Sequence, residues 1–162
     1  MVHVIDAWVG GRGLLQVSLF GGVVPLVQVE EKHQEKLLRG EQLRWLAEAA
    51  LVPHYWQSQL VTWKEIDATT AQVALAEHPN LQLTVQLHNE TLRIEGWRDC
   101  LLGDQFETRL WRGYLSQPKA TELGVLPTHM VGSWVVDGAE QVYFEAENYG
   151  FQVEWEAGTA TA

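Results

Sequence analysis

A single segment of this sequence has the residue spacing of a helix, and strand-like segments precede and follow it. Apolar residues recur in this segment at Leu43, Leu46, Ala47, Ala50 and Leu51. The spacing is that of one apolar stripe along a helix. Pro53 follows and predicts the end of the helix. Because this stripe must be buried against another element, the pattern predicts an α+β fold in which the helix packs on a sheet.

The flanking segments alternate apolar and polar residues, as strands do when one face is buried and the other is wet. Residues 81–88 (LQLTVQLH) are the clearest case. Further strands are predicted over residues 2–8, 14–20, 61–66, 71–77, 91–98, 107–116, 129–136, 140–147 and 150–156, with a short edge segment at 23–29. Turns are predicted at residues 78–80, 89–90, 137–138 and 148–150, and a loop at 99–106.

A long antiparallel meander tends to curl, so the predicted sheet is curved, with the shape of a half-barrel. We therefore expect a curved antiparallel sheet packed on one main amphipathic helix. The length of 162 residues suits one domain, predicted over residues 1–157, with a disordered tail at 158–162. The opposite stripe of the helix carries Glu41, Arg44 and Glu48, flanked by Trp45 and Val52. This mixture predicts that the helix is covered on two sides.

Composition narrows the function classes. The formal net charge of −10 disfavours binding to nucleic acid or to an anionic membrane surface. The single cysteine, Cys100, excludes an intrachain disulfide and a cysteine-based zinc site, and it favours a reducing, cytoplasmic location. The six histidines lack metal-binding spacing, so no metal site is expected. No cofactor is expected either. The sequence contains no run of about 18 apolar residues, so no transmembrane segment is predicted.

The helix segment also carries a motif. Residues 40–48 (GEQLRWLAE), with Pro53 beyond them, resemble a "GEL-RYLAE…P" motif of a large uncharacterised bacterial family of unknown function. The other matches, over about residues 2–156, are Asp6, residues 11–13, Trp63, Ile66, Asp67, Arg98, Trp111, Tyr114, Gly124, Leu126, Pro127, Trp134, Tyr143 and Phe144. This resemblance implies a sheet like the half-barrel of the lipoprotein carriers LolA and LolB, which hold acyl chains in a hydrophobic cavity.

Three functions are compatible with these observations. The favoured one is a noncatalytic binding or carrier domain for an apolar or amphipathic, lipid-like small molecule. The first alternative is an enzyme that acts on a small apolar substrate and uses Glu48 or His54 as its base. The second is a structural or interaction module that forms a homodimer through an exposed sheet edge. For the favoured function the expected ligand-binding residues are Arg44, Trp45, Glu48, Trp63, Arg98, Trp134 and Tyr143.

The pair Arg44 and Glu48 and the strand tryptophans each have a structural interpretation beside the ligand-binding one. Arg44 and Glu48 lie one helical turn apart, so they either form an exposed ion pair or face the polar head of a ligand. The strand tryptophans either fill the core or line an aromatic cavity. The sequence leaves both choices open.

Overall fold

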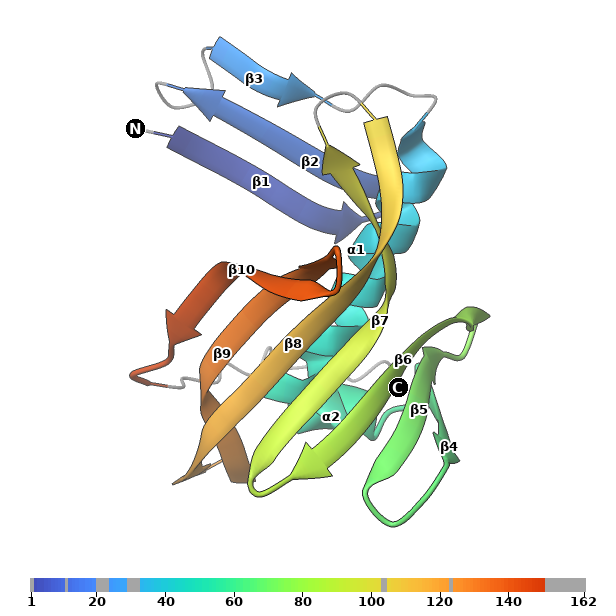
Figure 1. Ribbon diagram of the computed structural model, residues 1–162, viewed down its shortest axis with the longest axis vertical. Helices are drawn as coiled ribbons and strands as arrows, with labels where there is room; N and C mark the ends of the chain where they lie inside the picture. Colours follow the sequence, from blue (N-terminus) through green and yellow to red (C-terminus); the bar gives the residue numbers. More distant parts are fainter. Residues whose placement is uncertain are drawn as a thin grey trace, which may run out of the picture.

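The computed structural model describes residues 2–10, 12–19, 24–28, 33–102, 105–122 and 124–150. These residues form two antiparallel sheets that both pack on one main helix, α1 (Figure 1). The smaller sheet has the order β1 (Val2–Val9), β2 (Arg12–Leu19), β3 (Val24–Gln28). The larger sheet has the seven strands β4 (Val61–Glu65), β5 (Thr70–Leu75), β6 (His78–His88), β7 (Thr91–Leu102), β8 (Gln105–Thr121), β9 (Gly124–Val136) and β10 (Ala139–Glu147), in sequence order.

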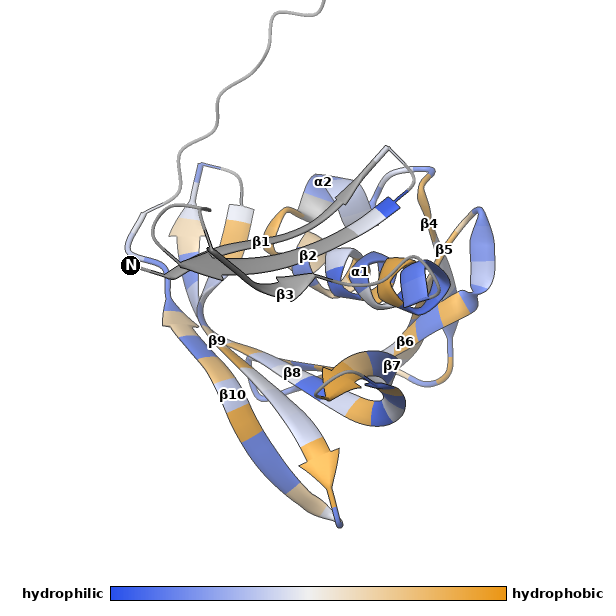
Figure 2. Ribbon diagram, turned by 90° about the horizontal axis from the view of Figure 1, so that it is seen from above, coloured by the Kyte–Doolittle hydropathy of each residue, from blue (hydrophilic) through white to orange (hydrophobic). Residues whose placement is uncertain are grey.

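The larger sheet is open and curved, and α1 lies against its concave face (Figure 2). The predicted α+β class, with a curved antiparallel sheet on one main helix, is therefore confirmed. The first three strands, however, form a sheet of their own instead of extending the large one. The reason is that α1 follows β3 in the chain and contacts both β2 and β7, so it separates the two sheets.

Helix α1 spans Gln34–Glu48 and continues through a 3-10 turn, η3 (Ala49–Leu51), into a short helix, α2 (Pro53–Trp56). The predicted apolar stripe is confirmed, since Leu43, Leu46, Ala47 and Ala50 are buried. Pro53 begins α2, because the first turn of a helix does not need the N–H that proline lacks. The helix starts earlier than the apolar stripe alone predicts.

Two glycines bring the helix close to both sheets. A Cβ atom on Gly13 of β2 would lie 2.8 Å from Leu37 Cγ, and one on Gly40 of α1 would lie 3.2 Å from the carbonyl oxygen of Asp99 on β7. Glu41 is only 6% exposed as a result of this packing around the helix. The prediction that the helix is covered beyond its apolar stripe is confirmed.

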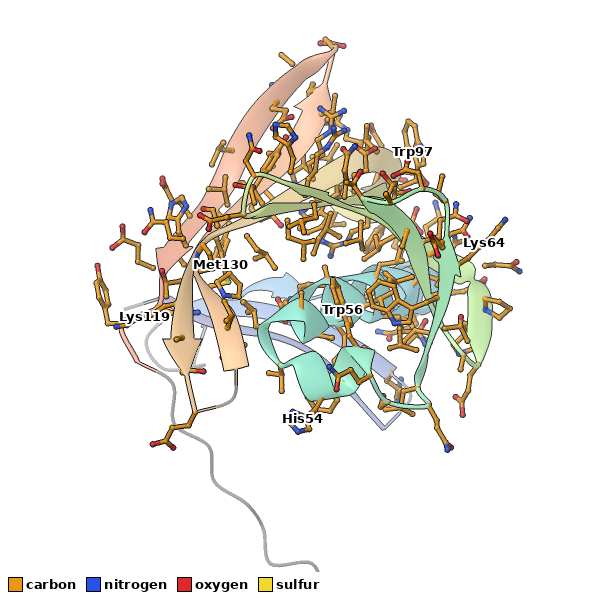
Figure 3. All side chains as sticks on the ribbon, turned by 90° about the horizontal axis from the view of Figure 1, so that it is seen from below. His54, Trp56, Lys64, Trp97, Lys119 and Met130 are labelled. Atoms are coloured by element: carbon orange, nitrogen blue, oxygen red, sulfur yellow. The ribbon has the colours of Figure 1, made fainter. Side chains whose placement is uncertain are left out.

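The core lies between α1 and the concave face of the large sheet. Its most deeply buried side chains include Leu46 on α1, Val73 on β5, Leu83 on β6 and Ile94 on β7. Burying such a side chain contributes about 1.5–3 kcal/mol to folding. The convex face is different: Trp97 is 65% exposed there and points away from the helix (Figure 3).

Two hairpin turns occur where the sequence predicts them. Asn89 and Glu90 have φ angles of 44° and 62°, and Asp137 and Gly138 have 52° and 80°. Positive φ at both central residues is the property of a type I′ turn, whose twist matches that of the strands. These turns join β6 to β7 and β9 to β10.

Several strand limits differ from the prediction. Residues 78–80 lie in β6, and the turn falls at residues 76–77, next to a register shift at Leu75. Most of the predicted loop at 99–106 is strand, because β7 and β8 stay paired from Asp99 opposite Thr108 to Leu102 opposite Gln105. Gly124 and Pro127 lie in β9 instead of in a connection.

Other predictions lie outside the described residues. These are the strand at 150–156, apart from Gly150, which has no regular structure, and the tail at 158–162. Among the described helices, none has both the length and the apolar composition needed to cross a membrane.

Candidate functional site

An apolar pocket of about 250 Å³ lies between the C-terminal half of α1 and strands β7 to β10. It is lined by Arg44, Ala47, Glu48, Leu51, Ile94, Trp111, Gly113, Leu115, Met130, Val131, Gly132, Tyr143 and Phe144. Most of this surface is hydrocarbon, and the two charged residues come from the helix. Met130 marks the β9 side of the pocket in Figure 3.

Two glycines form part of the sheet side of the pocket. Gly113 on β8 and Gly132 on β9 are directly opposite each other in the register. A Cβ atom on Gly113 would lie 2.5 Å from Cη2 of Trp111, so the indole ring of Trp111 lies over this glycine. A Cβ atom on Gly132 would lie 3.4 Å from the ring of Tyr143, an ordinary contact. Because these two glycines have no side chain, the rings of Trp111 and Tyr143 can lie against the sheet at these positions.

Three aromatic side chains form one wall. The Nε1–H of Trp111 donates a hydrogen bond of 3.0 Å to the hydroxyl oxygen of Tyr143. Tyr143 stacks on Trp134 with ring centroids 5.9 Å apart and an interplanar angle of 24°. Because Trp111 and Trp134 are partners in the β8–β9 register, the three rings join strands β8, β9 and β10.

The polar end of the pocket is formed by charges on α1. Arg44 Nε lies 3.4 Å from Glu48 Oε1, and Arg44 Nη2 lies 2.9 Å from Glu41 Oε2. The predicted pair of Arg44 with Glu48 is therefore present, but Arg44 also contacts a buried carboxylate. The side chain of Glu48 is 60% exposed, whereas that of Glu41 is 7% exposed. The Arg44 guanidinium thus links a buried acid to an acid in solvent.

A second pocket, of about 210 Å³, adjoins the first and shares Arg44 and Tyr143 with it. Its sheet side includes Arg98 on β7, which is 6% exposed. The Arg98 guanidinium carbon lies 5.2 Å from the ring centre of Trp111 and 5.6 Å from that of Trp134. Burial lowers the pKa of Arg98, while Tyr143 and Glu41 favour its charged form.

The structure brings together five of the seven expected ligand-binding residues. Arg44, Glu48 and Tyr143 line the apolar pocket, and Arg98 and Trp134 line the adjoining one together with Arg44 and Tyr143. The remaining two, and the predicted base His54, lie elsewhere. The ligand-binding role of all seven stays a prediction.

Trp45 and Trp63 line neither of these pockets. Trp45 packs edge-on against Tyr55, with centroids 5.5 Å apart. Trp63 is 48% exposed on β4, and its Nε1–H donates a hydrogen bond of 2.9 Å to the carbonyl oxygen of Trp56. His54 is exposed on α2 and lies on the side away from the large sheet (Figure 3).

Sequence reasoning missed the glycine pair and the burial of Glu41. The available signal was a glycine two residues after Trp111 and another two residues before Trp134, each within a predicted strand. Glycine inside a strand often marks a close approach of other groups. Which two glycines are paired depends on the β8–β9 register, which local patterns do not reveal.

The convex face carries a separate polar network. Arg112 Nε lies 3.0 Å from Glu95 Oε2, and Arg112 Nη1 lies 2.7 Å from Glu140 Oε1. The hydroxyls of Tyr114 and Ser133 also donate to Glu140, at 2.7 and 3.1 Å. Burial acts to raise the pKa values of both glutamates, but the hydrogen bonds outweigh it and lower them. This pairing ties β7, β8, β9 and β10 together.

Two further observations concern reactive groups. Burial raises the pKa of the Cys100 thiol, which disfavours a thiolate nucleophile at this position. The described residues contain no group of three or more His, Cys, Asp and Glu side chains that could hold a metal ion.

Comparison with known proteins gives a family assignment. The model of a family of unknown function, DUF6920, matches residues 1–149. No curated protein and no solved structure matches the chain. The prediction of an uncharacterised family, made from the helix motif, is thereby confirmed. The chain belongs to the DUF6920 family, whose function is unknown.

Proposed function

We propose that this protein is a noncatalytic binding or carrier domain, and that it holds an apolar or amphipathic small molecule between α1 and the large sheet. The observation that carries this proposal is the apolar pocket of about 250 Å³ with charged residues at one end. Its volume is slightly below the range of about 300–1,000 Å³ that is usual for drug-sized ligands. The ligand that fits is therefore smaller than a typical drug.

The proposal includes the half-barrel resemblance. An open curved sheet with a helix against its concave face is compatible with the half-barrel of LolA and LolB, which hold acyl chains in a hydrophobic cavity. Arg44 and Glu48 at the end of the pocket would then face the polar part of the ligand or the solvent beside it. Fold analogy alone does not assign function, so the pocket itself is the primary argument.

The enzyme alternative has less support from the geometry. Glu48 lies at the pocket, but it is largely exposed and contacts Arg44, so it is an ion-paired surface group more than a carboxylate held inside the pocket. His54 is outside the pocket.

Ligand uptake can be tested with a pair of matched variants. Ala47 and Ala50 lie one turn apart, both are buried, and only Ala47 lines the apolar pocket. We expect Ala47→Leu to reduce uptake of a short-chain fluorescent fatty acid, because the larger side chain fills the pocket. Ala50→Leu, which is also overpacked, should retain that uptake if circular dichroism shows both variants to be folded.

Native mass spectrometry of gently purified wild-type protein provides the second readout. A copurified small apolar molecule would support the proposal. Absence of any such molecule, together with no uptake of the fluorescent fatty acid by the wild-type protein, would refute it.

A further inference from the structure

Arg98 is a buried cation with unused hydrogen-bond donors. Its Nη2 donates a hydrogen bond of 3.1 Å to the carbonyl oxygen of Gly40 on α1. Its Nε and Nη1 have no hydrogen-bond partner among the described residues. A guanidinium has five N–H donors and no acceptor, so only an acceptor brought to it can satisfy them. Leaving buried donors of a charged group without partners is costly.

The neighbouring carboxylates are engaged with other arginines. Glu41 lies 2.9 Å from Arg44, and Asp99 lies 3.9 Å from Arg39 and accepts a hydrogen bond of 2.6 Å from Thr108. No carboxylate lies within ion-pair distance of Arg98 in the part of the chain that the structure describes. Glu41 and the Tyr143 hydroxyl both favour the charged guanidinium, and Tyr143 does so partly as a hydrogen-bonding neighbour. Nε and Nη1 still have no hydrogen-bond partner among the described residues.

The aromatic neighbours of Arg98 supply a cation–π contact but no lone-pair acceptor. The guanidinium carbon lies over the rings of Trp111 and Trp134, 5.2 and 5.6 Å from their centroids. This contact partly replaces the lost hydration, and Nε and Nη1 still have no hydrogen-bond partner among the described residues. The in-plane N–H groups remain suited to a planar acceptor with two oxygens, which is the geometry of a carboxylate.

The pocket beside Arg98 determines what acceptor fits. This pocket, of about 210 Å³, adjoins the apolar pocket at Arg44 and Tyr143, so a ligand in one is next to the other. Glu41 and Asp99 also line the Arg98 pocket. Their negative charges disfavour a dianion such as phosphate more than they disfavour a group with a single negative charge.

We infer that Arg98 binds the carboxylate of the ligand, and that this ligand is a medium-chain monocarboxylate whose hydrocarbon part occupies the apolar pocket. This inference rests on the proposed function and specifies its ligand class. Arg44 and Tyr143 lie where the two parts of the ligand meet.

Isothermal titration of the full chain with octanoate and with 1-octanol tests the inference. The two probes have the same chain length, and only octanoate carries a carboxylate at neutral pH. We expect the wild-type protein to bind octanoate about tenfold or more tightly than 1-octanol, as hydrogen bonds to a charged group predict. This comparison needs no variant, so it holds whether or not substitutions at Arg98 fold.

Two variants then locate the effect. Arg98→Gln should abolish the preference for octanoate and leave 1-octanol binding within about threefold of wild type. Arg109→Gln is the matched control, because Arg109 is opposite Arg98 in the β7–β8 register and pairs with Glu107 at 2.9 Å. It should keep the preference.

The outcomes separate this inference from the proposed function. Equal wild-type affinity for octanoate and 1-octanol would overturn the role of Arg98 and leave the apolar pocket supported. A preference that survives in folded Arg98→Gln would also overturn that role. Failure of both probes to bind would overturn the proposed function and this inference with it.

Discussion

A pair of glycine substitutions tests how the aromatic wall is packed. Gly113 and Gly132 are register partners on β8 and β9, and each would receive the same added methyl group on substitution by alanine. At Gly113 the new Cβ atom would lie 2.5 Å from Trp111 Cη2, about 1 Å inside the usual carbon–carbon contact distance. At Gly132 the nearest atoms, on Tyr143, would lie at 3.4 Å, which needs no rearrangement.

The Trp111 ring has little freedom to move away. Its Nε1–H is hydrogen-bonded to Tyr143, and the Arg98 guanidinium lies 5.2 Å from its centroid. Overpacking of this kind costs about 1–3 kcal/mol. Alanine also restricts the unfolded chain, which stabilises by about 0.4–1 kcal/mol at either position and cancels in the comparison. We therefore expect Gly113→Ala to be about 1–3 kcal/mol less stable than Gly132→Ala.

Urea unfolding followed by far-ultraviolet circular dichroism measures the difference. With a slope of about 1–3 kcal/mol per molar urea, a difference near 2 kcal/mol separates the two midpoints by about 1 M. Equal slopes for the two variants are the control for a comparable change in exposed surface. If Gly113→Ala unfolds at the same or a higher urea concentration than Gly132→Ala, Trp111 does not lie over Gly113 as described.

Two further predictions concern the core and the convex network. Leu46→Ala should lower the free energy of unfolding by about 2–5 kcal/mol in the same urea assay, because Leu46 is fully buried. Leu60→Ala is the control: this site is 53% exposed, and the change there should be less than about 0.5 kcal/mol. Glu140→Gln should destabilise the protein by up to about 1 kcal/mol at pH 7, through loss of charged contacts with Arg112 and Tyr114 at a solvent-exposed site. The pKa of Glu140 is lowered in the folded state, so its contribution is complete above the ordinary glutamate pKa of about 4.3 and is lost as pH falls through the folded value. The difference in unfolding free energy between wild type and Glu140→Gln should therefore shrink on acidification. Exposed Glu147→Gln is the control. A difference that stays constant down to pH 2 would contradict this role of Glu140.

The helix and the hairpin turns could be predicted because their determinants are local. Leu43, Leu46 and Ala47 have the spacing of one helix face whatever covers it. Asp137 and Gly138 supply the positive φ angles that a type I′ turn needs, and both angles are within the turn itself. Nothing distant in the chain is required for either conclusion.

Strand limits could not be predicted in the same way. Residues 99–102 are strand because they pair with residues 105–108 across the β7–β8 hairpin, which extends beyond the alternating pattern. Pro127 is tolerated inside β9 opposite Pro118 of β8, a pair in which neither residue has an N–H to donate. These outcomes depend on register, which is a property of two strands together.

In the candidate site, too, some features follow from local sequence and others depend on contacts between distant segments. Arg44 and Glu48 followed from helical spacing, and Trp134 was one of the strand tryptophans, whereas Arg98 and Tyr143 followed only from the family resemblance. Their convergence depends on the curvature of the large sheet and on the close approach of α1 at Gly40. Burial of Glu41 likewise depends on that approach, because the sequence places it on a stripe with other charged residues.

The position of Arg98 is the strongest reason to regard this region as a site and not only as a core. Replacing a buried charged group by an apolar one is often neutral or stabilising, so packing alone does not call for an arginine there. The two tryptophan faces and the Gly40 carbonyl compensate part of its desolvation, and two donor nitrogens remain. A residue that departs from the usual rules of burial and pairing is most often part of a functional site. A carboxylate at Arg98 would satisfy those donors and, through the adjoining apolar pocket, explain why the space beside the helix is not filled by side chains.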